Sequence, residues 1–316
     1  MLKLPHIPMQ DRTYLHEQLR MSAKKIILAT IAIMAASSST GHSLEEGESL
    51  HGQLATLNHA LRYTDGLQRA ARITERYQSL MAGRNPCSLA SDTKSLDDIF
   101  RATAFAQLYS LSESHVDTLT CLYQKLLRSE TVSTWHTLTY AEALVSIARF
   151  DDANRLLEQI KDEQTSPLPV IKQASAGANR DSWRLLSLEN TDEASVSHWK
   201  PAPEHLQVVA VVHPACGPSA RAMGEITGRN DLAWLRDRLI LLVPPGSTLP
   251  ARGMLEWNRS HPDLPMHRMY TRDDWAALAS LDTPTFYLMQ GTQVIERFQG
   301  WPNDAGLQRL QAALAL

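Results

Sequence analysis

The sequence has 316 residues, of which 43% are hydrophobic and 21% charged, and its formal net charge is −3. This length is enough for two domains, and the nearly balanced charge indicates neither a nucleic-acid partner nor an acidic solvating tail. The three cysteines have no zinc-type spacing, so we expect no metal site and no cofactor. In an oxidising compartment, three cysteines are consistent with one disulfide and one free thiol.

The N-terminal segment, residues 1–43, has the features of an export signal. Lys24 and Lys25 precede an apolar run at 26–36, and small polar residues follow. The run is about half as long as a membrane span requires, so we predict a signal peptide and no stable membrane span. The alternative is a short buried helix. The polar, mixed-charge residues before Met21 do not suit a signal peptide, so we predict that Met21 is the true start. The expected location is the periplasm, with secretion as the alternative.

Residues 44–165 have the hydrophobic period of α-helices. Leucines recur at helical spacing from residue 50 to 61, the same pattern continues from 70 to 80, and two further helices are expected at 96–108 and 115–127. We predict an all-α domain here, and we expect it to bind a protein partner.

The last helices of this domain resemble one tetratricopeptide-type helical hairpin. Ala141 and Ala153 are small enough to allow two helices to pack closely, and Phe150 with Asp151 is expected to provide the turn and the N-cap. We find no second or third copy at a fixed period, so the pattern indicates helical hairpins and not a counted repeat array.

Two of the cysteines lie in the helical domain. Cys87 is in a turn-type stretch, and Cys121 lies within the predicted helix 115–127. At about 100° per residue, Cys121 points away from the apolar stripe that contains Leu119 and Tyr123. A cysteine off the core face can reach a loop, so we predict a Cys87–Cys121 disulfide that leaves Cys216 free. The alternative is two unpaired thiols.

From residue 181 to 316 the period changes to that of an α/β domain. Residues 166–180 are rich in Ser, Pro, Ala and Gly, and we expect a linker there. Helix-compatible stretches between the early strands indicate a sheet covered by helices, and a helix is expected at 305–316. The last two strands are joined through a hairpin signal at 290–292. Strands are predicted at 183–188, 207–212, 239–243, 285–289 and 294–298.

One motif in this domain contains a cysteine in a position that favours reactivity. The apolar strand 207–212 runs directly into His213-Pro-Ala-Cys216-Gly-Pro-Ser219, and a helix-compatible stretch follows. Cys216 is therefore expected at a helix N-terminus, where unpaired N–H groups and the helix dipole stabilise the reactive thiolate. His213 is a candidate base or hydrogen-bond donor for this thiol. The alternative is a polar residue that faces solvent at the end of the strand.

Together with the downstream segment Asp282-Thr283-Pro284-Thr285, this motif resembles the thioredoxin superfamily over residues 181–316. In that superfamily a strand-end Cys-Gly-Pro-Cys motif faces a cis-proline loop. The resemblance implies a mixed sheet flanked by helices, with Pro284 as the cis-proline and with the Thr283 backbone available to an extended client peptide. Gly217 and Pro218 would shape the turn. A segment around 244–270 is similar to the central insertion of the peroxiredoxin and cytochrome-maturation branches.

The sequence departs from the thioredoxin pattern at the residues that drive dithiol exchange. Ser219 occupies the place of the second, resolving cysteine, and Ala215 that of the usual aromatic residue; strand 207–212 also lacks the buried acid often found there. A serine hydroxyl cannot attack a mixed disulfide, so a standard dithiol reductase cycle is not expected.

The remaining chemistry is that of a single thiol. Cys216 can attack a disulfide and hold the partner until a second thiol releases it, with Ser219 as a hydrogen-bond donor to the thiolate. We therefore expect an exported protein that forms mixed disulfides with client thiols. The alternative is a redox-inactive thioredoxin-fold binding scaffold in which Cys216 remains in a decayed site.

Overall fold

The computed structural model describes residues 49–89, 92–160, 167–173, 183–201, 203 and 205–314. The predicted signal peptide at 1–43, with the predicted start at Met21, lies outside the described residues, as does most of the linker expected at 166–180. Within the described ranges, no helix is both long and apolar enough to cross a membrane.

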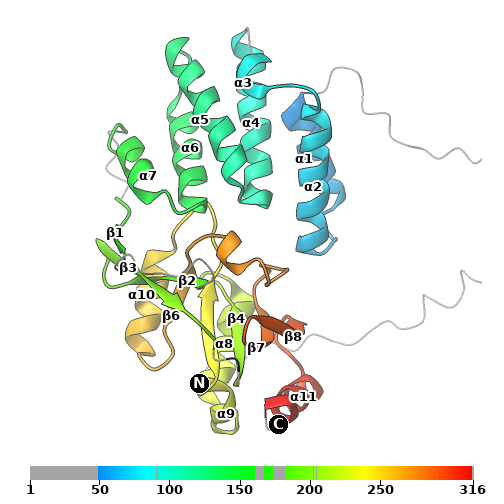
Figure 1. Ribbon diagram of the computed structural model, residues 1–316, viewed down its shortest axis with the longest axis vertical. Helices are drawn as coiled ribbons and strands as arrows, with labels where there is room; N and C mark the ends of the chain where they lie inside the picture. Colours follow the sequence, from blue (N-terminus) through cyan, green and yellow to red (C-terminus); the bar gives the residue numbers. More distant parts are fainter. Residues whose placement is uncertain are drawn as a thin grey trace, which may run out of the picture. The chain divides into compact units, whose positions relative to one another are not determined.

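Seven helices form the first part of the described chain, and Figure 1 shows most of them running side by side. Each predicted helix is present, with ends that differ by a few residues. Serine and aspartate side chains cap several N-termini by accepting a backbone hydrogen bond, as Ser49 does from Gly52 and Asp92 from Ser95. The helices are α1 (Leu50–Ala60), α2 (Gly66–Met81), α3 (Pro86–Leu89), α4 (Thr93–Ser110), α5 (Glu113–Arg128), α6 (Thr134–Ser146) and α7 (Phe150–Leu157).

Helices α6 and α7 form the hairpin that the sequence predicts. Ala141 and Ala153 are both buried, which is consistent with close packing of the two helices. The predicted N-cap is wrong, however. Phe150 is the first residue of α7 and is buried, and Arg149 precedes it without a side-chain cap. The chain enters α7 directly from a tight turn in which Ala148 has a positive φ of 63°, so no short polar side chain is positioned to accept from the first turn.

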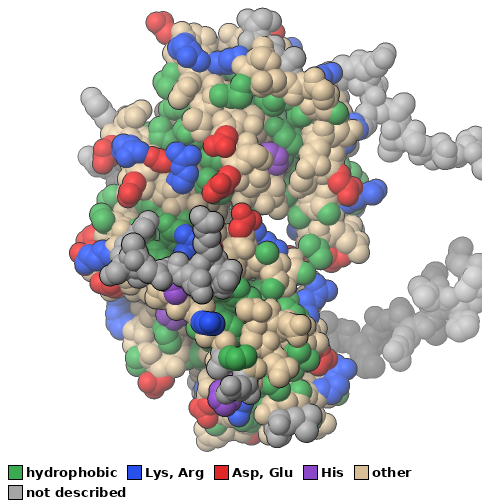
Figure 2. All heavy atoms as spheres, in the orientation of Figure 1, with side chains coloured by type: hydrophobic (Ala, Val, Ile, Leu, Met, Phe, Trp, Pro, Cys, Tyr) green, Lys and Arg blue, Asp and Glu red, His purple; other side chains and the backbone are tan. Residues whose placement is uncertain are grey.

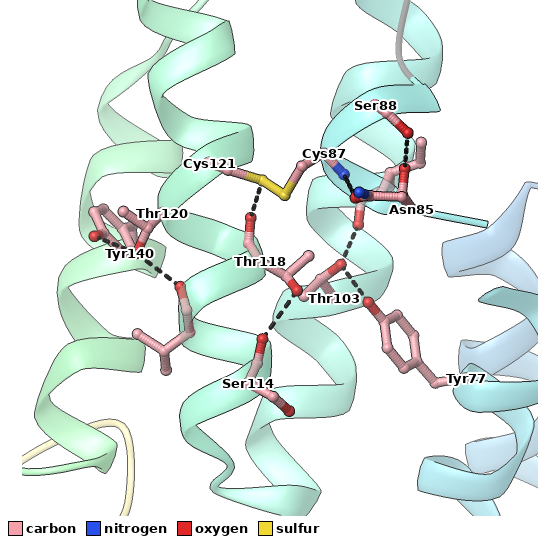
Figure 3. The surroundings of a disulfide bond; sticks show 12 residues. Tyr77, Asn85, Cys87, Ser88, Thr103, Ser114, Thr118, Thr120, Cys121 and Tyr140 are labelled. Atoms are coloured by element: carbon pink, nitrogen blue, oxygen red, sulfur yellow. Dashed lines mark hydrogen bonds between the residues drawn. A yellow bond between two sulfur atoms is a disulfide. The ribbon is translucent and has the colours of Figure 1, made fainter. Parts of the chain in front are cut away.

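The predicted disulfide is present between Cys87 of α3 and Cys121 of α5, with a Cα–Cα distance of 5.9 Å (Figure 3). Cys121 is only partly buried, whereas Leu119 and Tyr123 on the same helix are in the core. The bridge therefore joins the short helix α3 to the outer side of α5, and the apolar face of α5 stays free for packing.

A single mixed sheet of eight strands forms the second part, in the order β1-β3-β2-β6-β5-β4-β7-β8. The central strands β6, β5 and β4 are parallel, and β7 and β8 extend the sheet in antiparallel pairs. The five predicted strands are all observed. The strands are β1 (Val170–Gln173), β2 (Trp183–Leu188), β3 (Glu193–Trp199), β4 (Leu206–Val211), β5 (Leu239–Val243), β6 (Met266–Met269), β7 (Thr285–Gln290) and β8 (Gln293–Gln299).

Helices cover one face of this sheet. Val208 and Ala210 of β4 belong to the same buried cluster as Met223 and Leu310, whereas the neighbouring Val209 packs into a second cluster on the opposite face, around Trp275. Strand β4 is thus buried on both sides, as expected for a central strand. With β4, the following helix and the β7–β8 hairpin, this part has the thioredoxin-like fold that the sequence predicts. Its helices are α8 (Gly217–Gly228), α9 (Ala233–Arg236), α10 (Ala251–Ser260) and α11 (Asp304–Leu314).

Strand β1 lies within the range 166–180, where the sequence predicts a linker, and it pairs with β3 in parallel. The helices and the sheet belong to one compact unit and share one buried apolar cluster. The boundary at 165–181 therefore stays a prediction from composition.

Removing the disulfide should destabilise the protein without changing the Cys216 site. We expect the double substitution Cys87→Ala with Cys121→Ala to lower the free energy of unfolding by about 3–4 kcal/mol, the chain-entropy value for a loop of 34 residues. Urea unfolding followed by circular dichroism measures this change. Equal unfolding midpoints and slopes in the wild-type protein and the double variant would contradict it.

Candidate functional site

The candidate site is formed where β4 leaves the sheet. Residues 212–216 make a turn in which the Cys216 N–H donates to the carbonyl of His213 at 3.0 Å, and α8 starts at Gly217. Cys216 is the N-cap residue and is half-buried, and Pro218 occupies the first turn of the helix. Proline suits that position because the first N–H groups of a helix have no intrahelical partner. The turn thus holds the Cys216 thiol beside the positive end of the α8 dipole.

The loop before β7 faces this thiol. The Thr283–Pro284 peptide bond is cis, and the Cys216 thiol donates to the Thr283 carbonyl, with Sγ 3.4 Å from the oxygen. Two hydrogen bonds fix the loop: the Thr285 hydroxyl donates to the Asp282 carbonyl at 2.6 Å, and the Gly300 N–H donates to the Pro284 carbonyl at 2.8 Å. The structure therefore brings Cys216, Thr283 and Pro284 together, although they are distant in the sequence.

The environment of Cys216 favours its thiolate. Burial raises the pKa of the thiol, but hydrogen bonds from the Thr283 side chain and from the Ser219 N–H and hydroxyl outweigh it, and the net pKa lies below the ordinary value. The thiol bond to the Thr283 carbonyl describes the neutral form. Once the proton leaves, the hydroxyl groups and the N–H are the donors that stabilise the sulfur anion.

Ser219, in the first turn of α8, is almost fully buried. Its hydroxyl oxygen accepts a hydrogen bond from the His213 N–H at 3.3 Å, and the hydroxyl also interacts with Cys216. Ser219 therefore supports the turn and the thiolate at once. It has no sulfur with which to displace a partner bound to Cys216.

His213 lies in the same turn, and its ring accepts a hydrogen bond from the turn's own backbone. Its Nδ1 accepts a hydrogen bond from the Ala215 N–H at 3.2 Å, and burial lowers the pKa of the imidazole. No hydrogen bond joins the ring to Cys216 in the part of the chain that the structure describes. At neutral pH the ring is therefore mainly uncharged, and its visible role is to hold the turn.

A groove of about 410 Å³ adjoins this turn between α8 and α10. Its walls include His213, Ser219 and Trp257. Helix α10 approaches the turn closely at Gly253, where a Cβ atom would lie 2.8 Å from the Pro214 side chain. A larger residue at position 253 would therefore push α10 away from the turn.

One contact at the edge of the site had no recognisable signal in the sequence. Asp282, which directly precedes Thr283, accepts hydrogen bonds at 3.1 Å from the Gly66 N–H of α2 and from the Gln299 side chain. Gly66 is 216 positions away, and nothing in the local pattern of either residue indicates the contact. Among the described residues, no group of three His, Cys, Asp or Glu side chains is arranged to hold a metal ion.

Together, the strand, the Cys216 turn, α8 and the cis-proline hairpin define a site of the thioredoxin-like class. No protein-family model and no curated protein matches the sequence. The solved structures that are similar to it include two from Bacteroides species. A thioredoxin-like protein from Bacteroides caccae is 11% identical, with a TM-score of 0.27, and the match covers 80% of this chain and 94% of that one. The C-terminal domain of an uncharacterized protein from Bacteroides fragilis is 14% identical, with a TM-score of 0.26. That match covers 42% of this chain and 91% of the other. Both similarities are too weak to bear on function.

The pH dependence of alkylation tests the thiolate environment. We expect Cys216 in the folded protein to react with iodoacetamide with a midpoint pH below that of N-acetylcysteine, because the Cys216 pKa is lowered. The substitution Ser219→Ala should raise that midpoint, since it removes one hydrogen-bond donor to the anion. Ser197→Ala, at an exposed position on β3, is the matched control and should leave it unchanged. A wild-type midpoint at or above that of N-acetylcysteine would contradict the expectation. Mass spectrometry of the labelled peptide gives the midpoint.

Proposed function

We propose that the protein is an exported, single-cysteine member of the thioredoxin-like class that forms mixed disulfides with client proteins. The observation that supports this function best is the contact between Cys216 and the cis-proline loop, where the thiol lies 3.4 Å from the Thr283 carbonyl and its pKa is lowered. Disulfide exchange needs such a thiolate, because the thiolate and not the thiol is the nucleophile.

In the proposed reaction the Cys216 thiolate attacks one sulfur of a client disulfide. A new Cys216–client disulfide forms, the old client bond breaks, and the other client sulfur leaves as a thiolate. That thiolate, another client thiol or a small thiol then attacks the mixed disulfide and returns Cys216 as a thiolate. No electrons are gained or lost overall when a client thiol completes the cycle. Attack by the displaced thiolate restores the original disulfide, whereas attack by a different client thiol gives disulfide isomerisation. When no thiol follows, the client stays bound.

The neighbouring residues have separate roles in this proposal. Thr283 and Pro284 position the client backbone, and no described residue accepts a hydrogen bond from the Thr283 N–H, which leaves it available to an extended peptide. Gly217 and Pro218 shape the turn. Ser219 stabilises the thiolate without resolving the mixed disulfide.

Two features support the proposed location and partner. The Cys87–Cys121 disulfide suits an oxidising compartment, and together with the signal-type sequence before residue 44 it supports export to the periplasm. The helices α1–α7, which end in the tetratricopeptide-like pair α6–α7, provide the surface for a protein partner.

A binding scaffold without redox chemistry is the second candidate. It is favoured by the partial burial of Cys216, since only part of the side chain is accessible to a bulky disulfide. The two candidates differ in whether the native thiol reacts with a peptide disulfide.

A peptide carrying 5-thio-2-nitrobenzoate on its only cysteine tests that difference. We expect Cys216 to displace one equivalent of 5-thio-2-nitrobenzoate and to form a Cys216–peptide disulfide, faster than N-acetylcysteine does at the same pH. Absorbance follows the release, and intact mass identifies the adduct. Cys216→Ser is the control and should release none. A wild-type rate no greater than that of N-acetylcysteine would support the scaffold instead.

Restoring the second thiol should restore a dithiol cycle. The substitution Ser219→Cys places a sulfur beside Cys216, so we expect insulin reduction with dithiothreitol to become at least about tenfold faster than in the wild-type protein. Ser219→Ala and the double variant Cys216→Ser with Ser219→Cys are the controls, and both should stay at the background rate. If Ser219→Cys also stays at background while both thiols can be alkylated, the site lacks the geometry for exchange.

A further inference from the structure

A cleft of about 320 Å³ lies next to the cis-proline loop and is not part of the thiol site itself. One wall is formed by the start of α2 and the end of α4, and the other by Pro244 and the segment 279–282. Figure 2 shows the surface hollowed beside the lower ends of α1 and α2. Asp282 lines the cleft, and the next residue, Thr283, accepts the hydrogen bond from Cys216. The cleft therefore adjoins the thiol site through the cis-proline loop.

Two guanidinium groups line this cleft, Arg69 from α2 and Arg272 from the loop after β6. Arg272 donates only to backbone carbonyls, those of Trp275 at 2.7 Å and Leu278 at 3.0 Å. The Nε of Arg69 is buried and has no hydrogen-bond partner among the described residues. In the part of the chain that the structure describes, neither arginine forms an ion pair with a carboxylate.

Among the described residues that line the same cleft, Asp282 is the one carboxylate, and it forms no ion pair with either arginine. Asp282 is held by the Gly66 N–H and the Gln299 side chain, each 3.1 Å from its Oδ2. The described lining of the cleft thus holds two cations and a single anion. A second anionic group placed between the arginines would gain charge-assisted hydrogen bonds there.

The cleft also exposes apolar surface. Leu67 of α2 and Leu108 of α4 are 43% and 56% exposed, and both line it. Exposed large apolar side chains beside polar residues, arginine in particular, are typical of binding surfaces. A ligand that suits these walls combines a negative charge with an apolar group.

We propose that this cleft binds the segment of the client that flanks the reacting cysteine, and that the preferred segment carries a carboxylate next to an apolar side chain. The inference rests on the proposed exchange at Cys216. A client chain that is bonded to Cys216 and extends along the backbone of Thr283 would next reach Asp282, and with it the cleft. Because an extended chain advances about 3.4 Å per residue, the acidic residue lies within a few positions of the client cysteine.

Binding without chemistry tests the cleft alone. Fluorescence anisotropy is measured with Cys216→Ser protein and labelled peptides in which serine replaces the cysteine, with either Asp-Leu or Lys-Leu at the flanking positions. We expect the acidic peptide to bind at least about tenfold more tightly, with a preference that falls as salt is added. Arg69→Gln should abolish the preference, and Arg72→Gln, on an exposed position of the same helix, should retain it.

Three results would overturn the inference: no binding of either peptide, equal binding of both, or an unchanged preference in Arg69→Gln. The proposed function is tested separately with the same two peptides, each carrying cysteine activated by 5-thio-2-nitrobenzoate. Rapid labelling of Cys216 at equal rates by both peptides would leave exchange intact and overturn the cleft. Acidic-peptide binding without any labelling would support the cleft and remove the exchange function.

Discussion

The buried Arg268 guanidinium joins the helices to the sheet by a hydrogen bond, within the buried apolar cluster that the two parts share. It is completely inaccessible to solvent and, among the described residues, forms no ion pair. Its terminal nitrogens donate to the carbonyls of Met269 and Tyr270 at the end of β6 and to that of Val145 in the last turn of α6, at 2.8–3.0 Å. Burial lowers its pKa to about 10, so it is still charged at neutral pH. A cation is stabilised at a helix C-terminus, and the bond to Val145 is the one of these three that crosses from the sheet to α6.

That connection has a consequence for the thiol site. With α6 fixed on the sheet, the helical layer also brings the N-terminus of α2 to the cis-proline loop, where the Gly66 N–H meets the Asp282 carboxylate. A Cβ atom on residue 66 would overlap that carboxylate, so any larger residue would have to displace the Asp282 side chain. The residue before Thr283 is therefore positioned by a helix 216 residues away. The loop that faces Cys216 is built jointly by both parts of the chain.

The sequence predicted those features that depend on local pattern. Strands β4, β5 and β7 are continuous apolar runs, and Cys121 lies off the apolar stripe of its helix, so the strands and the disulfide could be inferred. Strand β3 was missed because Glu193–Trp199 is mostly small and polar residues, and β6 because four residues that include an arginine do not indicate a buried strand. The Arg268–Val145 bond gives no sequence signal, since every residue has a backbone carbonyl.

In a cysteine pair, the second cysteine both stabilises the thiolate and resolves the mixed disulfide. At the Cys216 motif, serine can perform only the first of these two roles. Ser219 keeps a donor beside the sulfur and so retains thiolate stabilisation, but it cannot attack the mixed disulfide. In the proposed function, release then depends on a thiol supplied by the client or by a small molecule. The lifetime of the mixed disulfide therefore depends on that external thiol. The protein has no second cysteine in the motif that could rapidly release an unsuitable client. Selectivity has to come from contacts made before the sulfur reacts. The cleft beside Asp282, where neither Arg69 nor Arg272 forms an ion pair with a described residue, is placed where such contacts would form.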